Sequence, residues 1–377
     1  MVEALDFDAL EALGIANARE RAPLIEYLAG LGFTAQEMAE AERRGRLFGL
    51  AGDVLQWSGP RTYSLRSAAE ALDVPVADVA HAWAMLGLTV ADPDTAALTQ
   101  ADVDGLATWV ALRAQIGADA ACGLLRVIGA TVARLAEAES AVVRVGAPDV
   151  WITQTHDELT TARAYRRVNE FIPRIGAMFD AVHRHHLVAA RAYFESVSPQ
   201  PAASVVCGVG FVDLSGFTAL TQMLTPEQLS AMLTEFGATV TDVVRADEGR
   251  VVKFIGDAVM WVSPTVARLA RTAVDLVDHP RVREVGLRVR AGLGYGEMLA
   301  VDGDYFGNPV NLAARLVAAA RPGQILAAPE IRDKLPDWPA IAQDPLPLKG
   351  FHAPVKAYDL SGGQRPRGMT NPPQRAD

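Results

Sequence analysis

The stretch from Ser204 to Phe217 constrains the fold most strongly, because an apolar run there ends in an acid and a glycine turn. Its valine-rich part predicts a buried strand that finishes at Asp213. The turn that follows contains Gly216 and leads into a helical pattern. A carboxylate at a strand end can bind a cation, and the free N–H groups at Gly216 and Phe217 can bind an anion. Plain helix capping explains the same residues, so this stretch alone leaves both interpretations open.

A second block, residues 250–261, places apolar runs on both sides of a Gly256-Asp257 pair. This pattern predicts a tight β-hairpin, and turn chemistry alone would account for the pair. We also expect Asp257 at the hairpin tip to lie beside Asp213, where two carboxylates could hold two divalent ions. Lys253 interrupts an otherwise apolar strand, where a lysine is rarely buried without a partner.

A third block, residues 304–315, predicts a helix with Asn308 as its cap and Pro309 in its first turn. Asn311 and Arg315 are four residues apart, so they share a helix face and can converge on one anion. A solvated helix face is the alternative. Because both residues are embedded among Val, Leu and Ala, we expect a buried pair.

In their order and separation, these blocks resemble the catalytic blocks of class III nucleotidyl cyclases. The resemblance is carried by residues 211–218, 253–257 and 304–315, and it covers roughly residues 200–362. No position in these blocks departs from the adenylyl pattern of that family. The family resemblance therefore implies a function for each polar residue in the blocks.

The resemblance implies that Asp213 and Asp257 bind two divalent metal ions, either Mg²⁺ or Mn²⁺, since both suit carboxylate oxygens. It also implies that Lys253 and Asp304 recognise the purine. A lysine donates to an unprotonated ring nitrogen and an aspartate accepts from an exocyclic amine, which is the pair that adenine offers. Guanine presents a ring N–H and a carbonyl instead, so ATP is the expected substrate.

By the same resemblance, Asn311 would orient the ribose, Arg315 would stabilise charge on the phosphates, and Lys349 would contact the terminal phosphates. In class III cyclases the metal carboxylates and the base-recognising residues come from different catalytic domains. The chain carries the full set once, so the resemblance implies a head-to-tail homodimer with shared active sites.

The implied activity is that of an adenylyl cyclase, which makes 3′,5′-cyclic AMP and pyrophosphate from ATP. A guanylyl cyclase conflicts with Lys253 and Asp304, and a diguanylate cyclase would need a Gly-Gly-Asp/Glu-Glu-Phe block that the sequence lacks. The alternative from another class is a catalytically silent nucleotide sensor or regulator built on a cyclase domain. The intact metal and phosphate residues disfavour it.

Residues 1–152 are rich in Ala and Leu and predict an all-helical domain, which the resemblance implies is a regulatory domain that inhibits the catalytic domain. Capping patterns at Thr34 and Thr99 mark helix starts. Residues 65–88 resemble a helix-turn-helix, but its second helix carries Asp78 and no basic residue, which argues against DNA binding. The expected helices span 3–14, 17–29, 35–47, 67–73, 77–87, 100–116 and 118–141.

Residues 153–200 predict a helical linker, with helices over 153–172 and 174–197 interrupted at Pro173. The second helix carries three clustered histidines, which form either a solvated stretch or a proton-responsive hinge. The resemblance raises the hinge interpretation, because some bacterial class III cyclases with such an N-terminal half are autoinhibited and pH-responsive. The histidines are His183, His185 and His186.

Residues 201–362 predict the catalytic domain, an α+β sandwich of the ferredoxin-like type with a largely antiparallel sheet. Gly292, Gly294 and Gly296 alternate along an expected strand over 287–299, which indicates close backbone packing rather than a dinucleotide site. Later strands are expected over 324–327, 341–348 and 355–360, and residues 363–377 are expected to be a disordered tail.

The 377 residues carry a net charge of −10, which argues against a nucleic-acid partner. The two cysteines lie far apart in the sequence, so they give no disulfide framework and suggest a reducing compartment. Neither a signal-peptide pattern nor an uncharged apolar run of about eighteen residues appears. We therefore expect a cytoplasmic protein without a membrane span.

Overall fold

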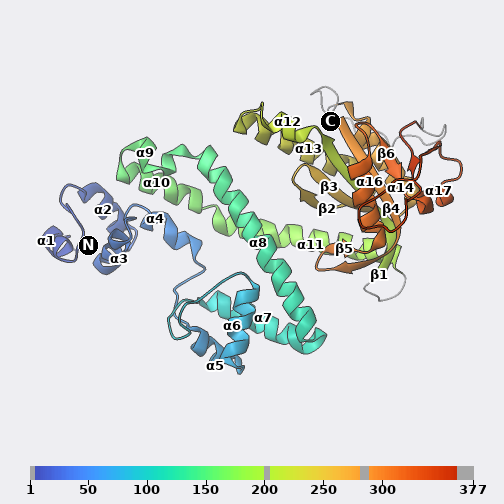
Figure 1. The fold of residues 1–377 in the computed structure, drawn as a ribbon. Coiled ribbons are helices and arrows are strands. Elements are labelled where there is room, and N and C mark those ends of the chain that lie inside the picture. The colour runs from blue at the N-terminus through green and yellow to red at the C-terminus, as the bar shows by residue number, and fades with distance from the viewer. Residues whose placement is uncertain (1–4, 199–203, 281–287, 363–377) are drawn as a thin grey trace. The chain divides into compact units, whose positions relative to one another are not determined.

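The computed structural model describes residues 5–198, 204–280 and 288–362 (Figure 1). The expected disordered tail, residues 363–377, lies outside them. The chain separates into two compact units, Met1–His185 and His186–Asp377. In the described ranges, no helix has both the length and the apolar character that a membrane crossing requires. The finer division at residues 152, 200 and 362 stays a prediction.

The first unit is all-helical in the residues described, as the sequence predicts. The capping boxes at Thr34 and Thr99 both form. The helix-turn-helix pattern gives two helices, and Asp78 in the second forms an ion pair with Arg113 (2.6 Å). The helices are α1 (Phe7–Ala12), α2 (Ala22–Gly30), α3 (Ala35–Arg43), α4 (Leu50–Asp53), η1 (Val54–Gln56), α5 (Leu65–Leu72), α6 (Val76–Met85), α7 (Gln100–Ile116), α8 (Ala118–Gly146), η2 (Pro148–Val150), α9 (Ile152–Thr155) and α10 (Glu158–Asn169).

The predicted continuous helix over 153–172 was wrong. The chain breaks at His156, which adopts a left-handed conformation, and Asp157 then caps α10. The next helix, α11 (Ile172–Val197), contains Pro173 in its first turn. A proline is tolerated there because the first N–H groups of a helix have no partner within the helix.

The second unit is built on one sheet with the strand order β2-β3-β1-β4-β6-β8-β7, and β5 pairs with β4. Every pairing is antiparallel except β4 with β6, which confirms the α+β class with a largely antiparallel sheet. Two of the later strands are much shorter than predicted. The strands are β1 (Ser204–Ser215), β2 (Arg250–Ile255), β3 (Ala258–Ser263), β4 (Arg288–Val301), β5 (Asp304–Phe306), β6 (Ile325–Ala327), β7 (Ile341–Ala342) and β8 (Tyr358–Asp359).

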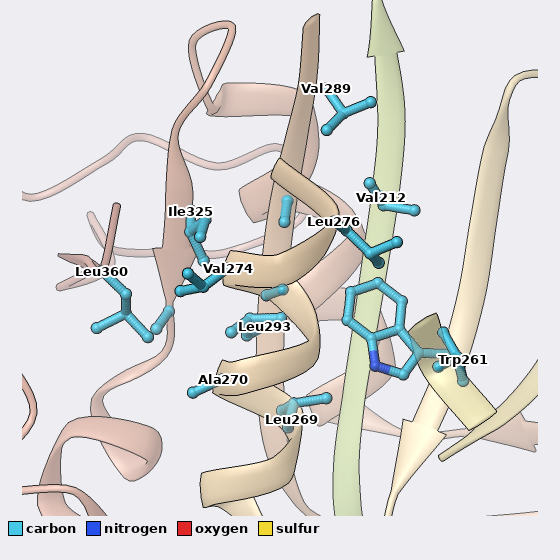
Figure 2. Packing of buried hydrophobic residues seen from close by; sticks show 14 of the residues in the cluster. Val212, Trp261, Leu269, Ala270, Val274, Leu276, Val289, Leu293, Ile325 and Leu360 are labelled. Carbon is cyan, nitrogen blue, oxygen red and sulfur yellow. The ribbon is translucent and has the colours of Figure 1, made fainter. Parts of the chain in front are cut away.

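Helices cover both faces of this sheet. They include α12 (Phe217–Thr221), α13 (Pro226–Ala246), α14 (Val266–Val277), α16 (Asn308–Ala319) and α17 (Pro329–Lys334). On one face, Leu269 and Val274 of α14 pack in a core with Val212, Trp261 and Leu293 (Figure 2). On the other face, α16 and the end of α11 contribute to a second core with β1, β3 and β4.

Alternation along β1 explains how one strand serves both cores. Val205, Cys207, Val209 and Phe211 belong to the core beneath α16, whereas the even-numbered Val212 belongs to the core beneath α14. Successive side chains of a strand point to opposite faces. Asp213 continues the odd-numbered series at the C-terminal end of the strand.

Glycines in β4 let α16 lie directly on the sheet. A Cβ atom at Gly292 would come within 2.3 Å of the Ala313 carbonyl oxygen, and one at Gly294 within 2.4 Å of the Pro309 carbonyl oxygen. Because Cβ atoms do not approach backbone so closely, only glycine allows this packing. The predicted close backbone packing is confirmed, and it fixes α16 against β4.

Candidate active site

The first group of predicted site residues lies where β1 ends. Asp213 is opposite Ala258 of β3 and opposite Arg290 of β4. The turn between β2 and β3 contains Gly256 in a left-handed conformation, and Asp257 completes it. Burial raises the pKa of the Asp257 carboxyl, and the adjacent charge and hydrogen bond of Asp213 raise it further. The structure therefore places the two aspartates together.

Arg290 is a member of this group that the sequence analysis missed. Its Nε and Nη2 atoms donate to Oδ2 of Asp213 at 2.8 and 2.6 Å. Its remaining terminal nitrogen donates to the carbonyl oxygens of Ala318 and Ala320 at 3.2 Å each. The guanidinium is thus held between α16 and the end of β1. The sequence feature that could have identified Arg290 is a charged residue within an apolar strand, which is also the feature that singled out Lys253.

The second group is an opposite-charge pair formed by Lys253 of β2 and Asp304 of β5. Lys253 Nζ donates to Oδ2 of Asp304, and the backbone N–H of Tyr305 donates to the other carboxylate oxygen at 2.8 Å. The two side chains are 36% and 25% exposed, so a ligand can reach both. The lysine that the sequence predicted to need a partner has one.

Arg290 and Asp304 lie at opposite ends of β4, whereas Lys253 on β2 is level with Gly292 through the pairings of β3 and β1. Arg290 is the third residue of the strand, whereas Asp304 pairs with Val301, its last residue. Among the described residues, no hydrogen bond or ion pair connects one group with the other. Large apolar side chains are exposed close to the second group in sequence, namely Phe254, Ile255 and Phe306.

The predicted burial of Asn311 and Arg315 was wrong, because both residues are exposed. Leu312 and Leu316 take the buried face of α16, so residues one position earlier point outward. The helix cap also differs from the prediction, since Gly307 occupies that position and Asn308 is already helical. The amide and the guanidinium still share a helix face, and that face is open to a ligand or a second chain.

The remaining predicted site residues are mostly exposed to solvent. Gly216 is exposed and left-handed, but α12 after it has only five residues, which limits the dipole that it offers an anion. The Phe217 side chain packs against the core beneath α14, so its backbone is the part available to a substrate. Lys349 is exposed. The three histidines of α11, His183, His185 and His186, are exposed as well.

Two aspartates form a donor set that suits Mg²⁺ or Mn²⁺. In the part of the chain that the structure describes, no cluster of three or more His, Cys, Asp or Glu side chains could hold a metal. Mg²⁺ is usually bound by one or two carboxylates together with waters and substrate phosphates rather than by a complete protein cage. The Oγ atom of Ser215, two residues after Asp213, is also buried without a hydrogen-bond partner. The residues present fit a metal that arrives with a nucleotide.

Comparison with known proteins assigns a family to both halves of the chain. The adenylate and guanylate cyclase catalytic domain matches residues 199–362, and the adenylate cyclase regulatory domain matches residues 4–190. An uncharacterized protein of Mycobacterium tuberculosis is 66% identical over 99% of this chain and 98% of its own length.

Several relatives carry names that describe an activity. A pH-sensitive adenylate cyclase of Mycobacterium tuberculosis is 29% identical over 94% of this chain and 91% of its own length. An adenylate cyclase of Streptomyces coelicolor is 31% identical over 73% of this chain and 72% of its own length. The chain therefore belongs to the adenylate and guanylate cyclase family, with an adenylate cyclase regulatory domain preceding the catalytic domain.

Proposed function

We propose that this protein converts ATP to 3′,5′-cyclic AMP and pyrophosphate, with two divalent ions at each active site of a head-to-tail homodimer. The ribose 3′ oxygen forms a bond to the α-phosphorus, and the bond from that phosphorus to the pyrophosphate oxygen breaks. The hydroxyl proton leaves to solvent. No covalent enzyme intermediate is needed, because positioning and electrostatics can supply the rate.

Asp213 and Asp257 would hold the divalent ions, supported by their adjacent carboxylates. When bound, such ions lower the pKa of a coordinated hydroxyl and neutralise charge on phosphate oxygens. Asn311 would orient the ribose, and Arg315 would donate to the phosphate oxygens as charge develops on them. Lys349 and the backbone at Gly216 and Phe217 would contact the phosphates.

The Lys253–Asp304 pair is the observation that carries the choice of ATP. With nucleotide bound, Lys253 would donate to N1 of adenine and Asp304 would accept from the N6 amine. The two side chains already lie together and partly exposed. Guanine would oppose its own ring N–H to the ammonium and its carbonyl to the carboxylate. A site that hydrogen-bonds its substrate discriminates strongly against such a mismatch.

The exposure of Asn311 and Arg315 supports shared sites. Both residues, with the purine pair, would complete the acid group of a second copy. The exposed Phe254, Ile255 and Phe306 are apolar surface of the kind that a partner chain covers. In a two-fold dimer each chain would then contribute acids to one site and purine recognition to the other.

We also propose that the helical unit inhibits the catalytic unit in a pH-dependent way. The support is the exposed cluster His183, His185 and His186 and the similarity to a relative named as pH-sensitive. On the same helix, Asp180 pairs with Arg184 at 2.9 Å, and this pair lowers the pKa of Asp180. Exposed i,i+4 ion pairs contribute little to helix stability, so this pair would not oppose a conformational change that follows protonation of the histidines. The cytoplasmic location also stays a prediction.

Cyclic nucleotide production from ATP and from GTP, with Mg²⁺ and with Mn²⁺, tests the proposed activity. We expect cyclic AMP from ATP and little product from GTP. A parallel series from about pH 5.5 to about 8, the range in which histidine titrates, would test regulation in the full chain. Equal activity at every pH would contradict the regulatory proposal but leave the catalytic one intact.

One observation favours the silent regulator as a second candidate. The Arg290 guanidinium occupies Oδ2 of Asp213, so a cation at that carboxylate must compete with it. A silent protein would keep this ion pair when ATP and Mn²⁺ are added. An enzyme would exchange it for metal binding, and Mn²⁺ titration of the nucleotide-bound protein separates the two cases.

A further inference from the structure

The C-terminal end of α11 is built into the core of the catalytic unit. Tyr193 and Val197 are each 7% exposed and pack with Cys207, Met298 and Tyr305. All of these residues belong to the second compact unit. The end of α11 is therefore a part of that unit, and its buried side chains reach the sheet beneath the purine-recognising pair.

Tyr193 is next to the strand that carries Lys253. The guanidinium of Arg250, three residues before Lys253 on β2, lies over the Tyr193 ring with its carbon 5.1 Å from the ring centroid. The ring of Phe194 is 5.9 Å from the same carbon. An arginine over an aromatic face within about 6 Å is attracted to the ring electrons.

Arg250 has few other interactions that could hold it. In the described ranges, no carboxylate forms an ion pair with this guanidinium, and its Nη1 atom is buried without a hydrogen-bond partner. A charge that is partly buried without a counter-ion depends on the groups that remain. The two aromatic rings of α11 are therefore its main support.

Tyr193 also lies in the same cluster as the residue beside Asp304. Tyr305 follows Asp304 directly, is 4% exposed, and donates its backbone N–H to the Asp304 carboxylate. Burial raises the pKa of both tyrosines, and the positive charge of Arg250, which lies over the Tyr193 ring, opposes that rise in each. One aromatic ring thus adjoins both supports of the purine pair.

The backbone of β2 makes Lys253 sensitive to this packing. The strand has an irregularity between Val251 and Lys253, where Val252 is left without a partner in the register. Val252 packs against the cluster that contains Tyr193 and Tyr305. A bulge of this kind changes the direction of the side chain that follows it. The direction of Lys253 therefore depends on how the bulge packs against the end of α11.

We propose that Tyr193 is a positioning residue for purine recognition, which acts on Lys253 through Arg250 and on Asp304 through Tyr305. This inference rests on the proposed recognition of ATP by Lys253 and Asp304. It assigns the end of α11 an effect on nucleotide affinity and on the choice between ATP and GTP, and none on the metal group at the other end of β4. A movement of α11 would then alter substrate affinity first.

The test compares three variants of the full chain. Tyr193→Leu removes the aromatic face and keeps apolar volume, Tyr193→Phe keeps the face and removes the hydroxyl, and Val197→Ala truncates the same core away from Arg250. Direct binding of 3′-deoxy-ATP and 3′-deoxy-GTP, which cannot cyclise, gives Kd values. Steady-state assays give KM and kcat, and thermal unfolding shows whether each variant is folded.

For Tyr193→Leu we expect Kd and KM for the adenine nucleotide to rise roughly three- to tenfold, the range that loss of one cation–aromatic contact gives. The preference for ATP over GTP should fall, while kcat and the half-saturating Mn²⁺ concentration stay within about twofold. Tyr193→Phe should keep the wild-type Kd and KM values, and Val197→Ala should leave the nucleotide preference unchanged. If Tyr193→Leu fails to fold, Arg250→Met should produce the same shift.

Unchanged Kd values and preference in Tyr193→Leu or, where that variant fails to fold, in Arg250→Met would overturn the proposal, as would an equal loss of preference in Val197→Ala. Failure of the proposed function is a separate result. A wild-type chain that binds 3′-deoxy-ATP but makes no cyclic AMP would contradict the enzyme, while the binding comparison would still decide the effect of Tyr193. A wild-type chain that binds neither nucleotide would overturn both.

Discussion

The two charged groups described above differ in their balance of charge. Near the start of β4, two carboxylates lie together and Arg290 neutralises one of them. Beyond its end, Asp304 forms an ion pair with Lys253 of β2, so these two charges neutralise each other. The first group has an excess of negative charge that suits cations, and the second presents a donor beside an acceptor that suits a purine edge. The difference supports the proposal that the first group binds metal ions and the second binds the purine, in active sites shared between two chains.

The largest effect should come from removing the acids. Asp213→Asn or Asp257→Asn should lower kcat at least about a hundredfold, because the ions that stabilise the transition state lose a ligand. Binding of 3′-deoxy-ATP without divalent ions should change little, since the purine pair is untouched. Asp242→Asn, an exposed aspartate on α13, is the matched control. Near-normal kcat in Asp213→Asn would contradict metal binding by Asp213.

Substitutions of Lys253 or Asp304 should change the affinity for ATP and the preference for ATP over GTP. Lys253→Met and Asp304→Asn should each raise KM for ATP about ten- to a hundredfold, because a hydrogen-bonding partner of the purine is lost. The half-saturating Mn²⁺ concentration should stay the same. Kinetics with ATP and GTP under both metals would show this. A variant that lowered kcat alone and kept its preference for ATP would contradict purine recognition by this pair.

Substitution of Arg290, unlike substitution of the acids, should strengthen metal binding. Arg290→Met should raise the Mn²⁺ affinity of the nucleotide-free protein several-fold, up to about tenfold, because a competing cation leaves Asp213. Titration calorimetry without nucleotide would measure the change. Arg288→Met, two residues earlier on β4 and exposed, is the matched control. Weaker Mn²⁺ binding in Arg290→Met would show that the arginine supports the acid group instead of competing for it.

The smallest expected effect is a pH dependence of the acid group. The pKa of Asp257 is raised, so this carboxyl takes up a proton at a higher pH than an ordinary aspartate does. Mn²⁺ affinity should therefore fall as the pH drops through that window. The folded metal-free protein binds this proton more tightly than the unfolded chain, so its stability should rise as the pH falls there.

Calorimetric Mn²⁺ titrations and thermal unfolding at a series of pH values would check both signs. Asp257→Asn should flatten the pH dependence of stability in the same window, because the amide does not titrate. A steeper fall of stability toward acid in the wild-type protein than in Asp257→Asn would contradict the raised pKa.

The sequence predicted those features that depend on neighbouring residues. Thr34 and Thr99 cap their helices through side-chain patterns that span three positions, and both capping boxes are present. The hairpin around Gly256 forms for the same reason, since a turn that requires a left-handed residue is visible in the local sequence. Alternating glycines in β4 correctly indicated close backbone packing, which the structure shows to be with α16.

Features set by contacts between distant segments were missed. Arg290 binds Asp213 because β4 pairs with β1 in one register, which the sequence of neither strand reveals. Asn311 and Arg315 were expected to be buried because their neighbours are apolar, yet those neighbours take the buried face themselves. The break at His156 depends on a left-handed conformation of a residue that rarely adopts it.

The most direct test of shared sites mixes two inactive full-length proteins, Asp213→Ala and Arg315→Ala. Each homodimer lacks one half of both its sites, whereas a mixed dimer has one site with intact acids and an intact arginine. With random pairing of an equal mixture, cyclic AMP production should recover to about one quarter of the wild-type rate. A mixture that forms mixed dimers and stays as inactive as its components would contradict active sites shared between two chains.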